Sequence, residues 1–354
     1  MEIIEKESNI MNDLVVEALK NNKLFMVEVD VTESCNCNCF FCFQGNVHQE
    51  RDNILTLDKI TSILDELESV GCYHLSFSGG EPFCRKDFLE ILREAKKRGF
   101  LVTLATNLQI PSIEEVEELG KIGLAKILVS FHSSKPSIYS DIFGISEDMY
   151  WKTLENIRIL LKSKTPVGIA VTVSDRNAKE LDDILELFMS LGIEKDNIRF
   201  NPLIESGNPI TEHRAGDLLK EYLPMHQHLR SNILSKVRTR NYSFICSAGK
   251  ASCVIKPNGD VLPCGLMNCV AGSIKDTTLM DVWNKSHVLK IFRSLSEGHF
   301  TKCQSCDYLE YCPICMATNL NESGIYHVPS EEYCVFRKNI SDSFGQGGIE
   351  NENK

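Results

Sequence analysis

Two hydrophobic patterns alternate along the chain from Leu24 onward. Short, nearly continuous apolar runs predict buried strands, and the stretches between them carry apolar residues three or four positions apart, which predicts helices. The predicted strands are Phe25–Val31, His74–Ser78, Leu101–Thr106, Ile127–Phe131, Val167–Val173 and Asn197–Pro202. The predicted helices are Leu57–Val70, Lys86–Arg98, Ser112–Leu119, Trp151–Leu161 and Ala178–Leu191. This alternation predicts an α/β fold with helices covering a parallel sheet, either doubly wound or curved into a barrel.

The rest of the pattern divides the chain into five regions. They are an N-terminal helix at 1–23, a core at 24–205, a helical linker at 206–245, a cysteine-rich region at 246–336 and a disordered tail at 337–354. Within the cysteine-rich region, Val254–Cys264 predicts a hairpin around the turn Asn258-Gly259. We expect one helix over Leu279–Leu295 to pack this region against the core.

A loop with three spaced cysteines follows the first predicted strand. Cys35, Cys39 and Cys42 have the spacing C-x3-C-x2-C. Three thiolates on a tight loop can hold three irons of a cubane cluster and leave the fourth iron open. The alternatives are a structural zinc site and a ferredoxin cluster, and each needs a fourth thiolate. Cys37 lies between two of the ligands and is poorly placed to supply it.

Polar and glycine-rich segments follow the next strands. Ser78-Gly79-Gly80-Glu81-Pro82 comes after the second strand, Thr106-Asn107 after the third, and Ser130 closes the fourth. Adjacent glycines allow the backbone to approach a ligand closely, and Glu81 can pair with an ammonium group. Taken alone, Gly-Gly-Glu-Pro and a strand-end serine are also compatible with simple turns.

Cysteines return at high density near the C-terminus. The eight candidate ligands are Cys246, Cys253, Cys264, Cys303, Cys306, Cys312, Cys315 and Cys334. Pairs with the spacing C-x2-C are also typical of zinc sites, so zinc is the alternative here.

These three blocks together resemble the radical S-adenosylmethionine (SAM) enzymes that carry a C-terminal SPASM extension. The family signature is C-x3-C-x-aromatic-C, and Phe41 occupies the aromatic position. The resemblance covers residues 24–336 and implies a partial (β/α)6 TIM-like barrel with a [4Fe-4S] cluster on Cys35, Cys39 and Cys42. The SAM-binding residues it implies are Phe41, Gly79, Gly80, Glu81, Asn107 and Ser130. Leu108 replaces the glycine of the family's Thr-Asn-Gly turn, which puts the local turn geometry in question.

The SPASM resemblance implies two auxiliary [4Fe-4S] clusters, and therefore three clusters in all. The inner cluster would bind Cys246, Cys253, Cys264 and Cys315, and the outer one Cys303, Cys306, Cys312 and Cys334. The family commonly has three residues between the last two cysteines of the central group, whereas two separate Cys312 from Cys315. The remaining cysteines, Cys37, Cys72, Cys84 and Cys269, are interpreted as buried or incidental thiols.

Composition restricts the cellular setting and the partners. Fifteen cysteines without a secretory signal segment indicate metal ligands in a reducing cytoplasm. No stretch has the ~20 apolar residues that span a bilayer, so no membrane association is expected. A net charge of −11 disfavours nucleic acid as a partner. His48, His74 and His132 have no ligand spacing and are interpreted as surface or hydrogen-bonded histidines.

The resemblance implies reductive cleavage of SAM and abstraction of a hydrogen atom from a substrate. Relatives with this extension mostly modify peptides or proteins, by a crosslink, a thioether or an oxidation, and a flavodoxin- or ferredoxin-type reductant is expected. Only 23 residues precede the predicted core at 24–205, so leader recognition would come from a separate protein, or the substrate lacks a leader. The enzyme alternative is a relative acting on a small molecule or tetrapyrrole. A sulfatase-maturing role is disfavoured because Gly265 stands where those relatives have an acidic residue. The non-enzyme alternative is an iron–sulfur electron carrier or a zinc-binding module.

Overall fold

The computed structural model describes residues 13–45, 53–203, 229, 246–309, 312 and 314–343. Residues 13–21 are helical, in agreement with the predicted N-terminal helix, and residues 1–12 lie outside the described part. The predicted linker at 206–245 also lies outside it, except for residue 229. No helix among the described residues is long and apolar enough to cross a membrane.

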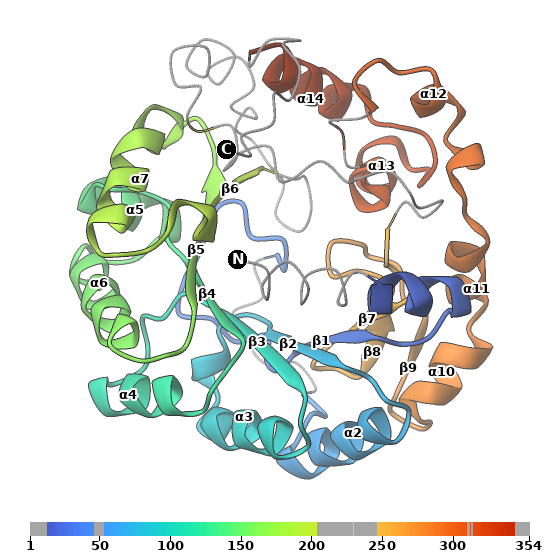
Figure 1. Cartoon of the computed structure of the whole chain (residues 1–354), viewed down its shortest axis with the longest axis horizontal. Coiled ribbons are helices and arrows are strands. Elements are labelled where there is room, and N and C mark those ends of the chain that lie inside the picture. Colours follow the sequence, from blue (N-terminus) through green and yellow to red (C-terminus); the bar gives the residue numbers. More distant parts are fainter. Residues whose placement is uncertain are drawn as a thin grey trace.

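A single curved sheet of nine strands organises the described chain, in the order β6-β5-β4-β3-β2-β1-β7-β8-β9 (Figure 1). The first six strands are parallel to their neighbours and confirm the six predicted strands. They are β1 Met26–Asp30, β2 His74–Ser78, β3 Leu101–Thr106, β4 Lys126–Ser130, β5 Val167–Val173 and β6 Ile198–Pro202. The sheet stays open, because β1 continues to β7 of the cysteine-rich region and does not close on β6.

Helices cover the outer side of this curved sheet (Figure 1). They are α2 Leu57–Ser69, α3 Phe88–Lys97, α4 Ile113–Lys121, α5 Pro136–Phe143, α6 Asp148–Leu161 and α7 Leu181–Ser190. α5 was not predicted, because its eight residues give too short a pattern; it starts at a proline and ends at Gly144, which has a positive φ.

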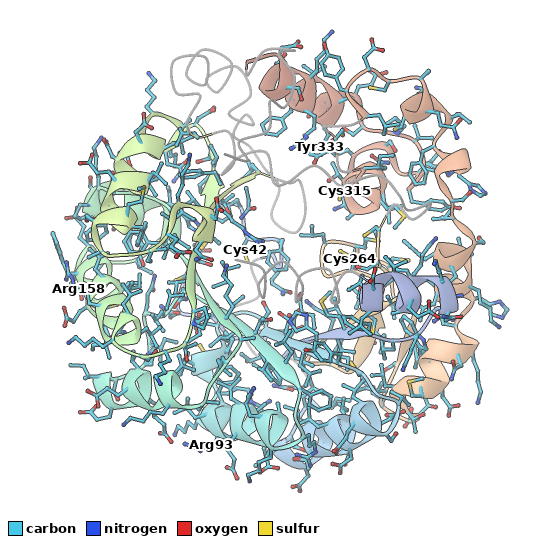
Figure 2. The ribbon with its side chains drawn as sticks, in the orientation of Figure 1. Cys42, Arg93, Arg158, Cys264, Cys315 and Tyr333 are labelled. Atoms are coloured by element: carbon cyan, nitrogen blue, oxygen red, sulfur yellow. The ribbon has the colours of Figure 1, made fainter. Side chains whose placement is uncertain are left out.

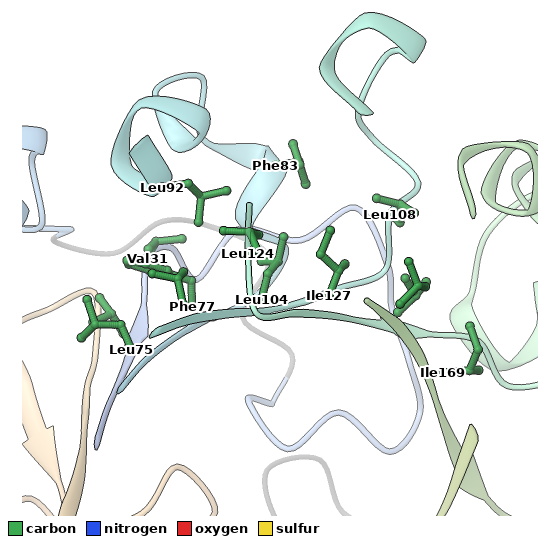
Figure 3. Packing of buried hydrophobic residues seen from close by; sticks show 14 of the residues in the cluster. Val31, Leu75, Phe77, Phe83, Leu92, Leu104, Leu108, Leu124, Ile127 and Ile169 are labelled. Carbon is green, nitrogen blue, oxygen red and sulfur yellow. The ribbon is translucent and has the colours of Figure 1, made fainter. Parts of the chain in front are cut away.

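The hydrophobic core lies between the sheet and these helices (Figure 3). Val27, Val29, Leu75, Phe77 and Leu104 point into it and are almost completely buried. Because side chains alternate along a strand, the residues between them face the opposite, concave side of the sheet. On β1 those residues are Glu28 and Asp30, so the concave side carries polar groups.

The cysteine-rich region extends the same sheet. β7, Ser252–Ile255, pairs in parallel with β1, and Val27 faces Cys253 in the register. β8, Asp260–Leu262, and β9, Gly272–Ser273, follow in antiparallel order. The predicted hairpin is therefore confirmed, with Gly259 at φ +85° in its turn.

The single helix predicted over Leu279–Leu295 was wrong in detail. Leu279–Leu295 forms two helices, α10 Leu279–Lys285 and α11 His287–Ser294, because the Ser286 side chain accepts a hydrogen bond from Leu289 N and begins a new helix. α10 packs the cysteine-rich region on the core, as expected. The Glu66 carboxylate of α2 accepts hydrogen bonds from Leu279 N at 3.1 Å and from Met280 N at 2.8 Å.

The C-terminal boundary also differs from the prediction. α12 Thr301–Gln304 and α13 Met316–Ser323 are followed by α14 Glu331–Ser343. Residues 337–343 are therefore helical and not part of a disordered tail, because Tyr333, Phe336 and Arg337 of α14 are buried. Residues 344–354 lie outside the described part.

Candidate active site

The three-cysteine loop, residues 31–45, leaves the end of β1 and turns back tightly. Cys35, Cys39 and Cys42 are all partly buried in it. Cys42 N donates to Cys39 O at 3.1 Å, and Asn38 N donates to Phe143 O of α5 at 2.8 Å. Figure 2 shows Cys42, Cys264 and Cys315 towards the centre of the molecule, whereas Arg93 and Arg158 lie on the outer helices.

The glycine pair after β2 holds the first part of this loop. Gly80 N donates to Thr32 O, and Glu81 N donates to Ser34 O, both at 2.8 Å. A Cβ on Gly79 would lie 2.5 Å from Thr32 O, and one on Gly80 would lie 2.3 Å from Ser34 O. Both glycines are therefore required for this backbone contact, whatever else they bind.

Glu81 lies completely buried between the ends of β2 and β3. Its Oε1 accepts hydrogen bonds from Thr106 Oγ1 at 2.6 Å and from Phe83 N at 3.2 Å. Its Oε2 accepts a hydrogen bond from Asn107 N at 2.7 Å. Burial raises the pKa of Glu81 to about 7, although these three donors act to lower it. The carboxylate thus joins two strand ends, and its contact with a cofactor ammonium group stays a prediction.

Asn107 and Leu108 form the turn after β3. The Asn107 side chain donates to Asn36 Oδ1 at 2.8 Å and to Cys37 Sγ at 3.3 Å, so it contacts the three-cysteine loop directly. Leu108 has φ +57° where the resembling family has glycine. The left-handed conformation costs roughly 1–2 kcal/mol, and burial of the leucine side chain (Figure 3) offsets it by about 2 kcal/mol. The turn therefore tolerates the missing glycine.

The aromatic residue of the loop reaches the end of β4. The ring of Phe41 lies edge-on to His132, with centroids 5.0 Å apart, and His132 stacks on Phe143 at 4.7 Å. His132 Nδ1 accepts Thr172 N at 3.1 Å, and burial lowers the pKa of His132 to about 3. His132 is therefore a neutral, hydrogen-bonded core histidine, as the sequence predicted. Ser130, two residues earlier, is partly buried at the end of β4.

A buried ion pair, missed by the sequence analysis, connects this loop to the cysteine-rich region. Asp30 is fully buried, and its Oδ2 accepts Lys256 Nζ at 2.6 Å and Gln44 Nε2 at 2.9 Å. Lys256 also contacts Gln44 Oε1. Asp30 ends β1, Gln44 follows Cys42 by two residues, and Lys256 lies in the β7–β8 hairpin. The network therefore holds the loop against the hairpin.

Seven of the C-terminal thiols form two groups. In the first, burial, with a smaller effect of the nearby thiols Cys246 and Cys315, raises the pKa of Cys264 to about 12. In the second, burial, with smaller effects of Cys334, Cys312 and Cys306, raises the pKa of Cys303 to about 11. The structure thus brings together three of the four cysteines assigned to the inner cluster and all four assigned to the outer one.

Cys253 does not reach the first group. It is fully buried in the main core, where burial raises the pKa of its thiol and its charged or thiol neighbours are Cys72 and Arg293. In the strand register Cys253 pairs with Val27 of β1, which faces the helices. The next residue, Val254, pairs with Glu28, which faces the concave side. The alternation of side chains along β7 therefore points Cys253 away from Cys264. Cys72, which the sequence analysis interpreted as a buried or incidental thiol, is buried and donates to Phe25 O at 3.4 Å.

Two of these donor sets match iron–sulfur clusters by their chemistry. A cubane takes thiolate ligands, three where one iron stays open and four where it is closed. The three-cysteine loop supplies three, and the group around Cys303 supplies four.

Comparison with known proteins identifies two domains in the chain. Residues 29–188 match the model of the radical SAM superfamily, and residues 246–307 match SPASM, an iron–sulfur cluster-binding domain. An AdoMet-dependent heme synthase from Methanosarcina barkeri is 28% identical over 339 residues, covering 88% of this chain and 96% of the relative. A PqqA peptide cyclase from Rhodopseudomonas palustris is 24% identical over 301 residues, covering 80% of this chain and 79% of the relative.

Solved structures agree with this assignment at the level of the fold. SuiB of Streptococcus suis, bound to S-adenosylmethionine, superposes with a TM-score of 0.67 and 21% identity over 93% of this chain and 82% of SuiB. The same protein bound to its precursor peptide SuiA superposes with a TM-score of 0.68 and 19% identity, over 90% of this chain and 78% of SuiB. Residues 29–188 are therefore a radical SAM domain with an open barrel, and residues 246–307 are a SPASM iron–sulfur cluster-binding domain.

Proposed function

We propose that the enzyme abstracts a hydrogen atom from a peptide or protein side chain and so starts a crosslink, a thioether or an oxidation. Cys35, Cys39 and Cys42 would hold a [4Fe-4S] cluster, and this cluster, once reduced by an external one-electron donor, would supply the electron for cleaving SAM to methionine and a 5′-deoxyadenosyl radical. Transfer of the substrate hydrogen atom to that radical would give 5′-deoxyadenosine and a substrate radical.

The chain's own residues bind and orient the reactants in this proposal. Phe41, Gly79, Gly80, Glu81, Asn107 and Ser130 surround SAM at the carboxyl ends of β1–β4, where parallel strands present ligand-binding groups. Most of these residues also contact the three-cysteine loop or each other, so the loop and the SAM site form one unit. The barrel would keep water and competing hydrogen donors away from the radical.

The Asp30–Gln44–Lys256 network is the observation that carries the proposal. Its hydrogen bonds hold the three-cysteine loop against the hairpin that leads to Cys264, which supports the proposal that the radical site and the inner auxiliary thiols share the concave space. An auxiliary cluster there could accept an electron from the substrate radical or bind the substrate. We propose three [4Fe-4S] clusters in all, with the fourth ligand of the inner one supplied by a group other than Cys253.

A peptide substrate is supported by the relatives. The PqqA peptide cyclase matches four-fifths of the chain, and SuiB has been solved with its precursor peptide on the same fold. A leader-binding partner protein and a flavodoxin- or ferredoxin-type reductant in the cytoplasm complete the proposal.

Tetrapyrrole modification is the second candidate function. The heme synthases favour it, because the Methanosarcina relative aligns over 96% of its own length. Both candidates use the same radical and differ only in the donor of the hydrogen atom.

Deuterium transfer distinguishes the two. The anaerobic enzyme is incubated with SAM, dithionite and either fully deuterated peptides encoded by short reading frames beside its gene or a deuterated tetrapyrrole carboxylate. We expect deuterium in 5′-deoxyadenosine only with a peptide. Transfer from the tetrapyrrole would refute the peptide assignment, and the absence of any SAM cleavage by the iron-loaded enzyme would refute the radical chemistry. A variant with Cys35, Cys39 and Cys42 replaced by alanine is the control.

A further inference from the structure

A chain of buried side-chain hydrogen bonds runs under the three-cysteine loop and centres on Gln109. Gln109 is 1% exposed. Its Oε1 accepts Asn36 Nδ2 at 2.6 Å and Cys37 Sγ at 3.2 Å, both from the segment between Cys35 and Cys39. Its Nε2 donates to Tyr139 OH of α5 at 2.9 Å.

The hydrogen-bond directions fix which way the Gln109 amide points. Thr153 Oγ1 donates to Met149 O at 2.8 Å, so it accepts the Tyr139 hydroxyl, which lies 3.1 Å away. Tyr139 is then free to accept from Gln109 Nε2, and the amide oxygen must face the loop. Tyr139 of α5 and Thr153 of α6 thus orient the Gln109 amide so that its Oε1 accepts hydrogen bonds from the three-cysteine loop.

Asn36 is held from both ends of its own amide. Asn36 Nδ2 donates to Gln109 Oε1, and Asn36 Oδ1 accepts Asn107 Nδ2 at 2.8 Å. The backbone of Gln109 in turn donates to Asn107 Oδ1 at 2.9 Å. Asn36 and Asn38 are exposed to solvent, so burial of their own side chains contributes little to the order of this segment. Hydrogen bonds from the β3–α4 turn supply that order instead.

We propose that Gln109 is a positioning residue of the radical reaction, which sets the conformation of the Cys35–Cys39 segment through Asn36 and Cys37. The inference rests on the proposed function, in which Cys35 and Cys39 bind the cluster that reduces SAM. Gln109 is buried, and its amide is engaged by Asn36, Cys37 and Tyr139, so it acts through the loop. A displacement of about 1 Å between reacting groups can lower a rate by roughly 100-fold, so the orientation of the loop matters to the chemistry.

The test compares Gln109→Leu with Asn156→Leu in the full-length, iron-reconstituted enzyme. Asn156 is a matched control, because its buried amide donates to Leu108 O at 3.0 Å and supports the same turn from α6 without touching the loop. Two quantities are measured at equal iron content: the change that SAM causes in the electron paramagnetic resonance spectrum of the reduced protein, and the rate of 5′-deoxyadenosine formation with dithionite.

Gln109→Leu should alter the SAM-dependent spectral change and slow 5′-deoxyadenosine formation at least about tenfold. Asn156→Leu should lower the melting temperature while leaving the spectrum and the rate within about twofold of the parent. A parent-like spectrum and rate in Gln109→Leu would overturn the proposal, and so would an equal loss in Asn156→Leu.

A second pair of variants decides the matter if Gln109→Leu does not fold. Cys37→Ser keeps a donor for Gln109 Oε1, whereas Cys37→Ala removes it, so serine should preserve the SAM-dependent spectrum and alanine should not. Equal behaviour of the two would contradict the inference. If the parent forms no 5′-deoxyadenosine, the proposed function fails, and the spectrum of the reduced cluster without SAM still tests the role of Gln109.

Discussion

Replacing Lys256 by methionine should destabilise the enzyme far more than the loss of an ordinary surface charge. The ammonium lies 2.6 Å from Asp30 Oδ2, and the two side chains are 16% and 1% exposed. At this distance the attraction is about 6 kcal/mol for an effective dielectric constant of about 20. Part of it offsets the desolvation of the lysine itself. Removing one partner of a buried pair leaves the other charge uncompensated, which typically costs about 3–5 kcal/mol.

The assay is urea unfolding followed by circular dichroism, with iron content measured in parallel. Lys285→Met is the matched control, because Lys285 also lies 2.6 Å from its partner, Asp281, but the side chains are 77% and 43% exposed. An exposed pair of this kind contributes about 0.3–0.5 kcal/mol. We expect Lys256→Met also to lose iron from the three-cysteine loop, because Gln44 loses its neighbour.

Asp30→Asn in the Lys256→Met background supplies the second control. It removes the unpaired charge, so the double variant should recover part of the lost stability. The reasoning is refuted if Lys256→Met costs no more than Lys285→Met, or if the double variant is less stable than Lys256→Met alone.

Three further comparisons of variants test other parts of the site. Gly80→Ala should fail to retain iron on the three-cysteine loop, because the new methyl group would lie 2.3 Å from a backbone oxygen, whereas Gly298→Ala, with its nearest contact at 3.6 Å, should bind iron like the parent. The pKa of Glu81 is raised to about 7, so its contribution to stability is present below about pH 4.5 and is lost as the pH rises through 7. The free energy of unfolding of the parent, relative to Glu81→Gln, should therefore fall by up to about 3 kcal/mol between pH 5 and pH 8. Urea titrations at the two pH values measure it. Cys253→Ala should keep the iron content of the parent while Cys264→Ala loses about four irons, and equal losses in the two would place Cys253 among the ligands.

The strands could be predicted closely because burial on the helix side leaves a strong pattern. β2, β3 and β5 begin and end at the predicted residues. β3 and β5 are nearly continuous apolar runs, as expected of strands inside a parallel sheet, and in all three strands the positions that face the helices are buried. The start of α4 is also determined locally, because its capping box joins Ser112 and Glu115, which are only three residues apart.

Elements that depend on tertiary contacts could not be predicted in this way. α5 exists because Tyr139, Ile142 and Phe143 are buried against the rest of the core, and eight residues are too few to show a period. The break at Ser286 is equally weak in sequence, because a single serine is compatible with continuing a helix. The same holds for α14, whose buried face is formed by contacts outside its own segment.

The roles of Gln109 and Lys256 could not be predicted from the sequence for a related reason. Gln109 meets Cys37 across 72 positions, and Lys256 meets Asp30 across 226. No local spacing marks such pairs, since glutamine and lysine are ordinary surface residues. A charged residue at the end of an apolar strand, as Asp30 is, gives a hint that a partner exists but not which residue provides it.

The residues that the family resemblance assigns to SAM have a second task in this chain, and this affects how their variants are interpreted. Gly79 and Gly80 hold the backbone at residues 31–34, Glu81 joins the turn after β3, and Asn107 contacts Asn36. A lower SAM affinity in a variant of these residues could therefore arise from a displaced cysteine loop as well as from a lost cofactor contact. The two causes separate at equal iron content. A lost contact leaves the spectrum of the reduced cluster without SAM unchanged, whereas a displaced loop alters it before any cofactor binds.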